Sequence, residues 1–276
     1  MIYEVMDLKI EGYNLETSAT LHCYRLDDFN QDNSKHIRPA VIICPGGGYE
    51  HTSNREAEPI AMRYLAAGYH AFVIRYHVAP VRFPVALLEL ASAVKLIREN
   101  AKEWQVDQKR VVLNGFSAGG HLAGSLSTFW SSDWLAKKLE TTKEEIRPNG
   151  CILAYPVITS GEYAHRGSFD NLLGEQHELV DFVSLEKQVN ENTPPMFLWH
   201  TYTDTSVPVE NSLLFLSALR KHKISAEFHM YPKGGHGLAL ANEETQMLDG
   251  RGIQRECQGW IDLAIRWIRE LGGTSC

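Results

Sequence analysis

The sequence has no long hydrophobic run, no secretory leader and no excess of basic residues. Its apolar stretches fall well short of the roughly 20 residues that a membrane-spanning helix needs. Residues 1–10 alternate between apolar and polar and contain no basic segment followed by an apolar core, so no signal peptide is predicted. We therefore expect a cytoplasmic protein. With 27 Lys and Arg against 34 Asp and Glu, the net charge of −7 argues against nucleic acid or an anionic membrane as a partner.

Cysteine is scarce and carries no recognisable pattern. The five cysteines are odd in number, widely separated and never spaced as Cys-x-x-Cys, so the sequence suggests neither a disulfide framework nor a zinc site. We expect them to be buried, reduced thiols. No His-Glu-x-x-His and no clustered His and Asp residues at metal-ligand spacing occur either. The sequence therefore predicts neither a metal nor an organic cofactor.

Short apolar runs alternate with amphipathic segments along most of the 276 residues. We expect strands at 3–10, 19–25, 39–44, 70–76, 150–157, 196–200 and 225–231, and a further short strand that begins at 111. We expect helices at 55–67, 84–100, 122–126, 209–221 and 253–271. The first two strands form an antiparallel hairpin through 11–14, and 27–38 is a polar loop. The alternation that follows predicts an α/β fold with a mostly parallel, doubly wound central sheet.

Residues 158–193 interrupt this alternation with several glycines and polar side chains. A helical piece is expected from about 177 to 189. Because an insertion after a strand lies over the carboxyl ends of a parallel sheet, we expect a small cap that forms a pocket wall. No repeat, linker or low-complexity tract divides the chain, so a single domain over 1–276 is expected.

The stretch from Val111 to Leu126 carries the strongest chemical signal. A β-branched run leads into Gly115-Phe116-Ser117-Ala118-Gly119, and a helical segment follows. Strand, Gly-x-Ser-x-Gly and helix in this order are typical of a nucleophile elbow, in which a strained turn lifts the serine hydroxyl clear of the sheet. Ser117 is the candidate nucleophile.

A serine nucleophile needs a histidine base and an acid that orients the base, and in this arrangement they follow in the order serine, acid, histidine. Asp204 lies after the predicted strand 196–200, and His236 lies after the predicted strand 225–231. Each residue therefore falls at a strand end, in the required order. The flanking glycines leave room for the imidazole of His236.

Other residues of the same types are less well placed. Asp170 and Asp181 lie in the insertion, and Glu210 follows Asp204 by six residues; each is more simply a solvated charge. The remaining candidate bases are His229 inside a strand, His200 at a strand end and His121, one turn beyond Ser117, where packing beneath the elbow is the simpler role.

Three consecutive glycines follow the predicted strand 39–44, in Pro45-Gly46-Gly47-Gly48-Tyr49. Without Cβ atoms, their amide N–H groups can point together into a cavity. We expect Gly47 and Gly48, with the amide of Ala118, to form an oxyanion hole; a flexible turn is the simpler alternative.

Four motifs together resemble bacterial α/β-hydrolases related to acetyl-xylan esterases, often called sugar hydrolases or xylanase-like esterases. They are the glycine stretch 45–49, the elbow 115–121, the segment 199–208 with Asp204 and Pro208, and Gly235-His236-Gly237-Leu238. The resemblance extends over about 39 to 270. It implies the α/β-hydrolase fold, the removal of small acyl groups, chiefly acetyl, from sugar hydroxyls, and a possible homodimer. Pro45 stands where such enzymes often have histidine, a change that leaves backbone donors in place.

The predicted pocket stretches offer hydroxyl-bearing side chains suited to a sugar: Tyr49, Tyr76, Tyr155 and Tyr202. Each could equally be a half-buried packing residue. The expected partner is thus a small-molecule ester, in the form of an acylated sugar or oligosaccharide. Another esterase, an arylformamidase or a peptide hydrolase on the same triad is the alternative, and a non-catalytic binding protein is a remote one. No pair of carboxylates suggests a glycosidase.

Overall fold

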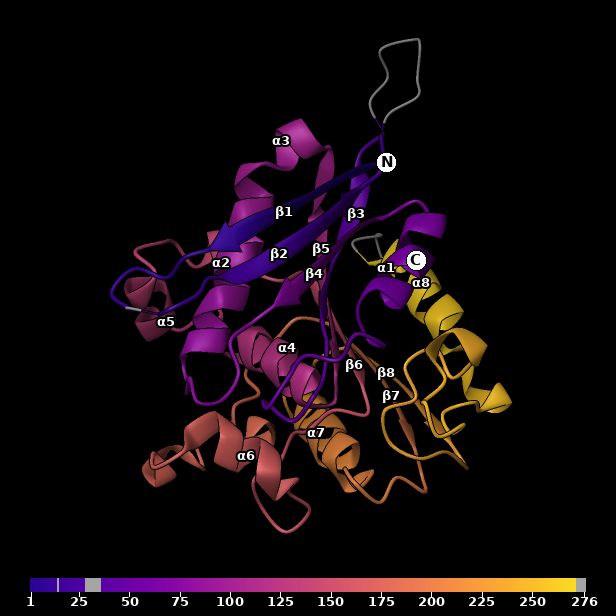
Figure 1. Ribbon diagram of the computed structural model, residues 1–276. Helices are drawn as coiled ribbons and strands as arrows, with labels where there is room; N and C mark the ends of the chain where they lie inside the picture. The colour runs from indigo at the N-terminus through magenta and orange to yellow at the C-terminus, as the bar shows by residue number, and fades with distance from the viewer. Residues whose placement is uncertain (14, 28–35, 272–276) are drawn as a thin grey trace.

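The computed structural model describes residues 1–13, 15–27 and 36–271 (Figure 1). Asn14 of the expected hairpin turn, residues 28–35 of the expected loop at 27–38 and Cys276 lie outside these ranges. The fold is built on one sheet of eight strands in the order β1-β2-β4-β3-β5-β6-β7-β8. The strands are β1 (Ile2–Leu8), β2 (Ala19–Arg25), β3 (Arg38–Cys44), β4 (His70–Arg75), β5 (Val106–Phe116), β6 (Gly150–Ala154), β7 (Met196–Thr201) and β8 (Ala226–Tyr231).

The pairing matches the expected topology. Strand β1 pairs antiparallel with β2, and β2 pairs antiparallel with β4. All the remaining neighbours, from β4 through β8, are parallel. The predicted fold class, an α/β-hydrolase fold with a mostly parallel sheet, is therefore confirmed.

Helices cover both faces of this sheet (Figure 1). They are α1 (Glu58–Ala66), α2 (Val85–Glu99), α3 (Ala101–Trp104), α4 (Ser117–Phe129), α5 (Asp133–Lys138), α6 (Arg166–Leu173), α7 (Glu210–Lys221) and α8 (Trp260–Glu270). Buried residues of α2, α4 and α7 form one core with one face of the sheet, and those of α1 and α8 form a second core with the other face. None of the helices within the described ranges has the length and apolar composition of a membrane span.

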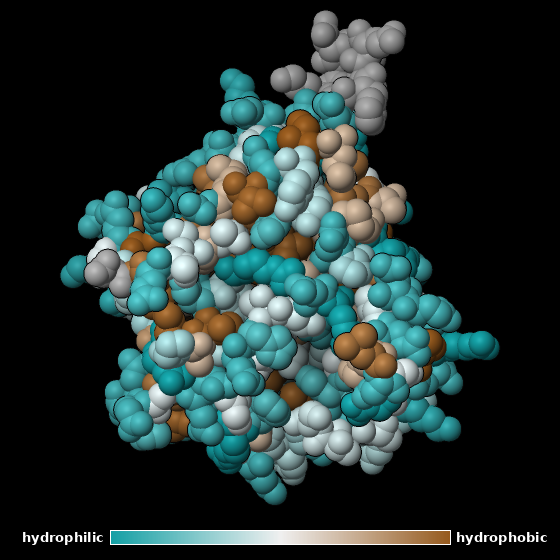
Figure 2. Space-filling model, viewed as in Figure 1, coloured by the Kyte–Doolittle hydropathy of each residue, from teal (hydrophilic) through white to brown (hydrophobic). Residues whose placement is uncertain are grey.

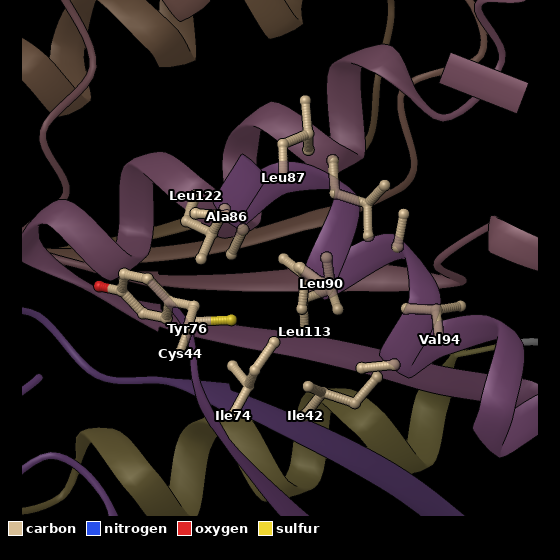
Figure 3. Close-up of a cluster of buried hydrophobic side chains, with 14 of the residues drawn as sticks. Ile42, Cys44, Ile74, Tyr76, Ala86, Leu87, Leu90, Val94, Leu113 and Leu122 are labelled. Atoms are coloured by element: carbon tan, nitrogen blue, oxygen red, sulfur yellow. The ribbon is translucent and has the colours of Figure 1, made fainter. Parts of the chain in front are cut away.

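The alternation of side chains along the central strands explains these two cores. Ile42 of β3 belongs to the core under α2 and α4, whereas its neighbours Val41 and Ile43 belong to the core under α1 and α8. The first core is drawn in Figure 3, where side chains of α2 and α4 meet those of the strands: Leu87, Leu90, Val94 and Leu122 against Ile42, Ile74 and Leu113. On the viewed face of the molecule, hydrophobic residues are scattered among hydrophilic ones (Figure 2).

Several observed elements differ from the expected ones, among them β5, the final helix and the insertion. Strand β5 begins at Val106, five residues before the expected 111, because Val106 pairs with Arg38 across an irregularity in register. The final helix begins at Trp260 rather than at 253, because a short 3₁₀ turn at Arg255–Cys257 precedes it and Gly259 caps it.

In the insertion, the expected helix at 177–189 is wrong. The α-helix there is α6, and 177–189 contains only 3₁₀ turns, at His177–Leu179 and Leu185–Lys187. Two interactions take the place of helical hydrogen bonds here, one to a distant segment and one between near neighbours in the chain. The Leu185 amide donates to the carbonyl oxygen of Ile158, and the Ser184 hydroxyl donates to the carboxylate of Glu186. Side chains that bond locally in this way compete with a continuous helix.

Candidate active site

The end of β5 forms the sharp turn that the sequence predicts. Phe116 is extended, Ser117 has a φ of 52°, and α4 begins at Ser117 itself. This left-handed conformation is unfavourable for a serine. The two glycines are needed because of close packing: a Cβ on Gly115 would overlap the carbonyl oxygen of Gly119, and one on Gly119 would overlap that of Cys44. The turn is therefore a nucleophile elbow in geometry as well as in sequence.

Ser117, His236 and Asp204 form one continuous chain of hydrogen bonds. The Oγ of Ser117 lies 2.7 Å from Nε2 of His236, and Nδ1 of His236 lies 2.7 Å from Oδ2 of Asp204. Since an ionised carboxylate only accepts, Nδ1 of His236 carries the proton and Nε2 is left to accept from the serine hydroxyl. The three side chains come from the ends of β5, β7 and β8. This is the geometry of a Ser-His-Asp triad.

The carboxylate of Asp204 is fully surrounded by donors. Its Oδ1 accepts the amides of Ser206 at 2.9 Å and Val207 at 3.0 Å, and Nε2 of His200 lies 3.4 Å from Oδ2. Burial alone would raise the pKa of Asp204, but hydrogen bonds from His200, His236 and the Val207 amide outweigh it and hold the pKa well below its usual range. Asp204 therefore stays ionised at neutral pH, ready to stabilise a protonated His236.

The glycine loop after β3 leaves two amides free. The carbonyl oxygen of Gly46 accepts the amide of Ser53, and that of Gly47 accepts the amides of Glu50 and His51. Because the N–H and C=O groups of one peptide unit point in opposite directions, the amides of Gly47 and Gly48 face away from this turn. Neither of them donates to any of the described residues. The loop thus presents donors of the kind expected for an oxyanion hole.

Ala118 is the third predicted donor. It is the second residue of α4, whose first N–H groups have no partner inside the helix. These amides and the helix dipole favour negative charge next to Ser117. An oxyanion hole formed by Gly47, Gly48 and Ala118 stays a prediction and belongs to the proposal below.

Three of the four predicted pocket tyrosines do not face solvent. Tyr49, Tyr76 and Tyr155 are 3%, 4% and 1% exposed. Each hydroxyl donates to a protein group: Tyr49 to Nδ1 of His121, Tyr76 to the carbonyl oxygen of Pro45 and Tyr155 to Oε1 of Glu56. These contacts are the ones expected of packing residues, and the assignment of the three tyrosines to the pocket wall stays a prediction. Tyr202 is 65% exposed.

The alternative acids and bases have other partners. Asp181 is paired with Lys187, and His229 with Glu227. His121 is buried, donates from Nε2 to the carbonyl oxygen of Val183 and accepts from Tyr49. Asp170 is exposed, and Glu210 is the first residue of α7. Among the described residues, no group of three or more His, Cys, Asp or Glu is arranged to hold a metal ion.

Sequence reasoning missed the residues of the insertion that reach the glycine loop. In α6, Nδ2 of Asn171 donates to the carbonyl oxygen of Gly48 at 3.0 Å. Nδ1 of His165, which caps α6, lies 2.8 Å from Oγ of Ser168. Burial and the nearby His236 lower the pKa of His165. The polar composition of 158–193 indicated a cap, but the sequence alone could not indicate which of its side chains reach the loop.

Comparisons with known proteins agree with this geometry. The BD-FAE family model matches residues 26–219. Endo-1,4-beta-xylanase B of Butyrivibrio fibrisolvens is 42% identical over 84% of this chain and 37% of its own length. Acetylxylan esterase of Xylanibacter ruminicola is 31% identical over 73% of this chain and 41% of its own length. The chain thus spans about two fifths of these curated relatives.

Two solved structures match nearly the whole chain. The acetyl ester-xyloside bifunctional hydrolase of Caldicellulosiruptor lactoaceticus is 38% identical, with a TM-score of 0.84 over 98% of this chain and 96% of that one. The carboxylesterase Cest-2923 of Lactobacillus plantarum is 30% identical, with a TM-score of 0.86 over 99% and 100%. Together with the elbow and the hydrogen-bonded Ser117, His236 and Asp204, these matches show that the chain belongs to the BD-FAE family of α/β-hydrolases.

Proposed function

We propose that this protein is a serine carboxylic-ester hydrolase that removes short acyl groups, chiefly acetyl, from sugars or oligosaccharides. The observation that carries the proposal is the unbroken chain from Ser117 through His236 to Asp204, with both links at 2.7 Å. The sugar ester as substrate is supported by the names of two relatives, an acetylxylan esterase and an acetyl ester-xyloside hydrolase. A cytoplasmic location, a single domain and a homodimer remain predictions from the sequence.

The proposed reaction follows from the geometry. His236 Nε2 takes the proton of Ser117 as its Oγ attacks the ester carbonyl carbon, and the resulting oxyanion is stabilised by the amides of Gly47, Gly48 and Ala118. As the bond to the sugar oxygen breaks, His236 returns the proton to that oxygen and the alcohol leaves. Water then attacks the acyl-enzyme with His236 again as base, releasing the carboxylic acid and restoring Ser117.

The test compares wild type with Ser117→Ala on acetylated xylo-oligosaccharides and on p-nitrophenyl acetate, butyrate and octanoate. We expect wild type to release acetate from the oligosaccharides and to prefer acetate among the nitrophenyl esters, and Ser117→Ala to lose both activities. Ser125→Ala is the matched control, because it removes a buried hydroxyl from the same helix. Among the described residues, that hydroxyl donates to the carbonyl oxygen of His121.

Each result separates the alternatives. Cleavage of the nitrophenyl acetate alone would retain the triad and reject the sugar ester, and formamides and other esters would be tested next. Full activity in Ser117→Ala would reject the triad. No hydrolysis of any ester by wild type would favour a binding protein. A p-nitrophenyl β-xyloside tests glycosidase activity, which we expect to be absent.

A further inference from the structure

A carboxylate that the proposed reaction does not use lies beneath the glycine loop. Glu56, in the segment between the loop and α1, is 3% exposed. Its Oε2 accepts the amide of Gly46 at 2.9 Å, and its Oε1 accepts the hydroxyl of Tyr155 at 2.7 Å. Among the described residues it forms no ion pair. Burying a carboxyl group without a cation is costly. The two hydrogen bonds therefore have to offset the cost of removing the Glu56 side chain from water.

The hydroxyl of Tyr155 extends this link to the histidine side of the site. It accepts the amide of Ala239 at 2.8 Å, three residues beyond His236. The ring of Tyr155 also packs against the imidazole of His236, with centroids 5.1 Å apart. Glu56 and Tyr155 thereby connect the segments that follow β3, β6 and β8, three strands whose ends surround Ser117.

The contact at Gly46 ties Glu56 directly to the nucleophile. A Cβ on Gly46 would lie 2.8 Å from Oε2 of Glu56, 2.8 Å from the carbonyl oxygen of Phe116 and 2.9 Å from Cβ of Ser117. Gly46 is therefore wedged between the carboxylate and the elbow. Because its amide is bonded to Glu56, the orientation of this peptide is fixed, and the amides of Gly47 and Gly48 follow it in the chain.

The backbone of the connected segments is strained, and strained loops need support. Tyr155 and Ala239 have φ values of 37° and 52°, which are unfavourable for residues with a Cβ, whereas Gly47 and Gly48, at 129° and 64°, adopt conformations open to glycine. Strained conformations persist where surrounding interactions hold them. A negative charge this close to the site would itself oppose an oxyanion, so Glu56 is not suited to stabilise the transition state by charge.

We propose that Glu56 is a positioning residue for ester hydrolysis, which holds the oxyanion amides through Gly46 and the histidine loop through Tyr155. The inference rests on the proposed function, because it assigns a role within the same reaction. A residue that only stabilises the fold would change the unfolding free energy and leave the turnover of the folded enzyme unaltered.

The test measures kcat and KM for p-nitrophenyl acetate in Glu56→Gln, Tyr155→Phe and the double variant. The control is Glu50→Gln, which removes an exposed carboxylate from the same loop. Losing one oxyanion donor costs about 10²–10³-fold in kcat, so a displaced loop should lower kcat by roughly 10–100-fold with KM within about twofold. Phenylboronic acid, whose adduct with Ser117 places an oxygen in the oxyanion position, should bind more weakly in parallel.

The double variant shows whether the two residues act together. If they do, the double variant should lose about as much kcat as the less active of the two single variants. Independent residues would instead give a fold-loss equal to the product of the two single losses. Folding of each variant is checked by circular dichroism at the assay temperature. If Glu56→Gln fails to fold, the proposal is tested with Tyr155→Phe, which keeps the aromatic ring and removes only the hydroxyl.

Failure of this inference is distinct from failure of the proposed function. An inactive wild type would reject the function. An active wild type with Glu56→Gln and Tyr155→Phe both within twofold of Glu50→Gln would reject the positioning role, as would losses expressed in KM with kcat unchanged.

Discussion

His200 Nε2 lies 3.4 Å from Oδ2 of Asp204, the same oxygen that accepts Nδ1 of His236 at 2.7 Å. The two histidines differ in access. His200 is fully buried, with Nε2 also bonded to the carbonyl oxygen of Val207 and Nδ1 to the hydroxyl of Ser212. His236 is 21% exposed in its side chain and reaches Ser117. One carboxylate therefore orients two imidazoles, and only one of them faces the nucleophile.

Replacing Asp204 with asparagine should abolish most of the activity while preserving the fold. The amide nitrogen of asparagine cannot accept the Nδ1 proton of His236, so the imidazole would adopt the tautomer that cannot accept from Ser117. In serine hydrolases this change lowers kcat about 10⁴-fold. The measurement is kcat for p-nitrophenyl acetate, with Asp181→Asn, an exposed acid paired with Lys187, as control. Retention of even a tenth of the activity would argue that Asp204 is not the orienting acid.

His121 should make the fold sensitive to mild acid. Burial lowers its pKa to about 4, whereas in the unfolded chain it is near 6.5. Between these values the unfolded chain binds more protons, so stability falls as the pH falls from 6.5 toward 4. In His121→Gln, the loss of unfolding free energy between pH 7 and pH 5 should be smaller than in wild type by roughly 2 kcal/mol.

Urea unfolding at pH 7, 6 and 5 checks this expectation. His70 has a pKa lowered to about 4 by burial and nearby Arg38, so wild type and the His121 variant both retain that second contribution. Parallel pH dependence in wild type and His121→Gln would show that His121 titrates normally in the folded protein.

Gly119→Ala should prevent formation of the elbow. The new methyl group would overlap the carbonyl oxygens of Cys44 and Pro45, which belong to the backbone and cannot rotate away. We expect a destabilisation above about 3 kcal/mol, in the range of severe core overpacking. The matched change is Gly235→Ala, because a Cβ there meets nothing within 4 Å. The melting temperatures of the two variants are compared, and equal values would contradict the packing described at Gly119.

Tyr64→Phe should lower stability with little effect on turnover. The Tyr64 hydroxyl donates to Oδ1 of Asn114 at 2.8 Å, and both residues are fully buried beside the start of the elbow. Leaving a buried acceptor unpaired costs about 1–3 kcal/mol. The unfolding free energies of Tyr64→Phe and of the double variant Tyr64→Phe/Asn114→Leu are measured in urea. The double variant should regain part of the stability lost in Tyr64→Phe, because it no longer buries an unpaired amide. A single variant as stable as wild type would mean that Asn114 finds another donor.

The sequence was sufficient to predict the fold class and to indicate which serine, acid and histidine lie together. Buried parallel strands such as Val41–Cys44 are continuous apolar runs, and the positions of Asp204 and His236 follow because parallel strands deliver their carboxyl ends to one edge. Membership of the resembled family and the α/β-hydrolase fold are confirmed. The catalytic roles of Ser117, Asp204 and His236 stay predictions, although the structure brings the three side chains together.

What could not be predicted depends on contacts between distant segments. Tyr155 follows a strand, as a pocket residue would, and only the packing around it shows that its ring is enclosed and its hydroxyl bonded to Glu56, 99 residues earlier. Glu56 itself stands in a polar stretch that resembles any solvated turn. In the insertion, hydrogen bonds to neighbouring loops decided the local structure, and helical propensity over 177–189 gave the wrong element.

The distribution of the site along the chain has a consequence for how activity is acquired during folding. The bond between Ser117 and His236 joins residues 119 apart in the sequence, and β8, which precedes His236, is an edge strand of the sheet. Contacts between residues so far apart in sequence form slowly. During refolding, esterase activity should therefore recover later than the far-UV circular dichroism signal of the helices. Turnover would then report when the sheet is complete.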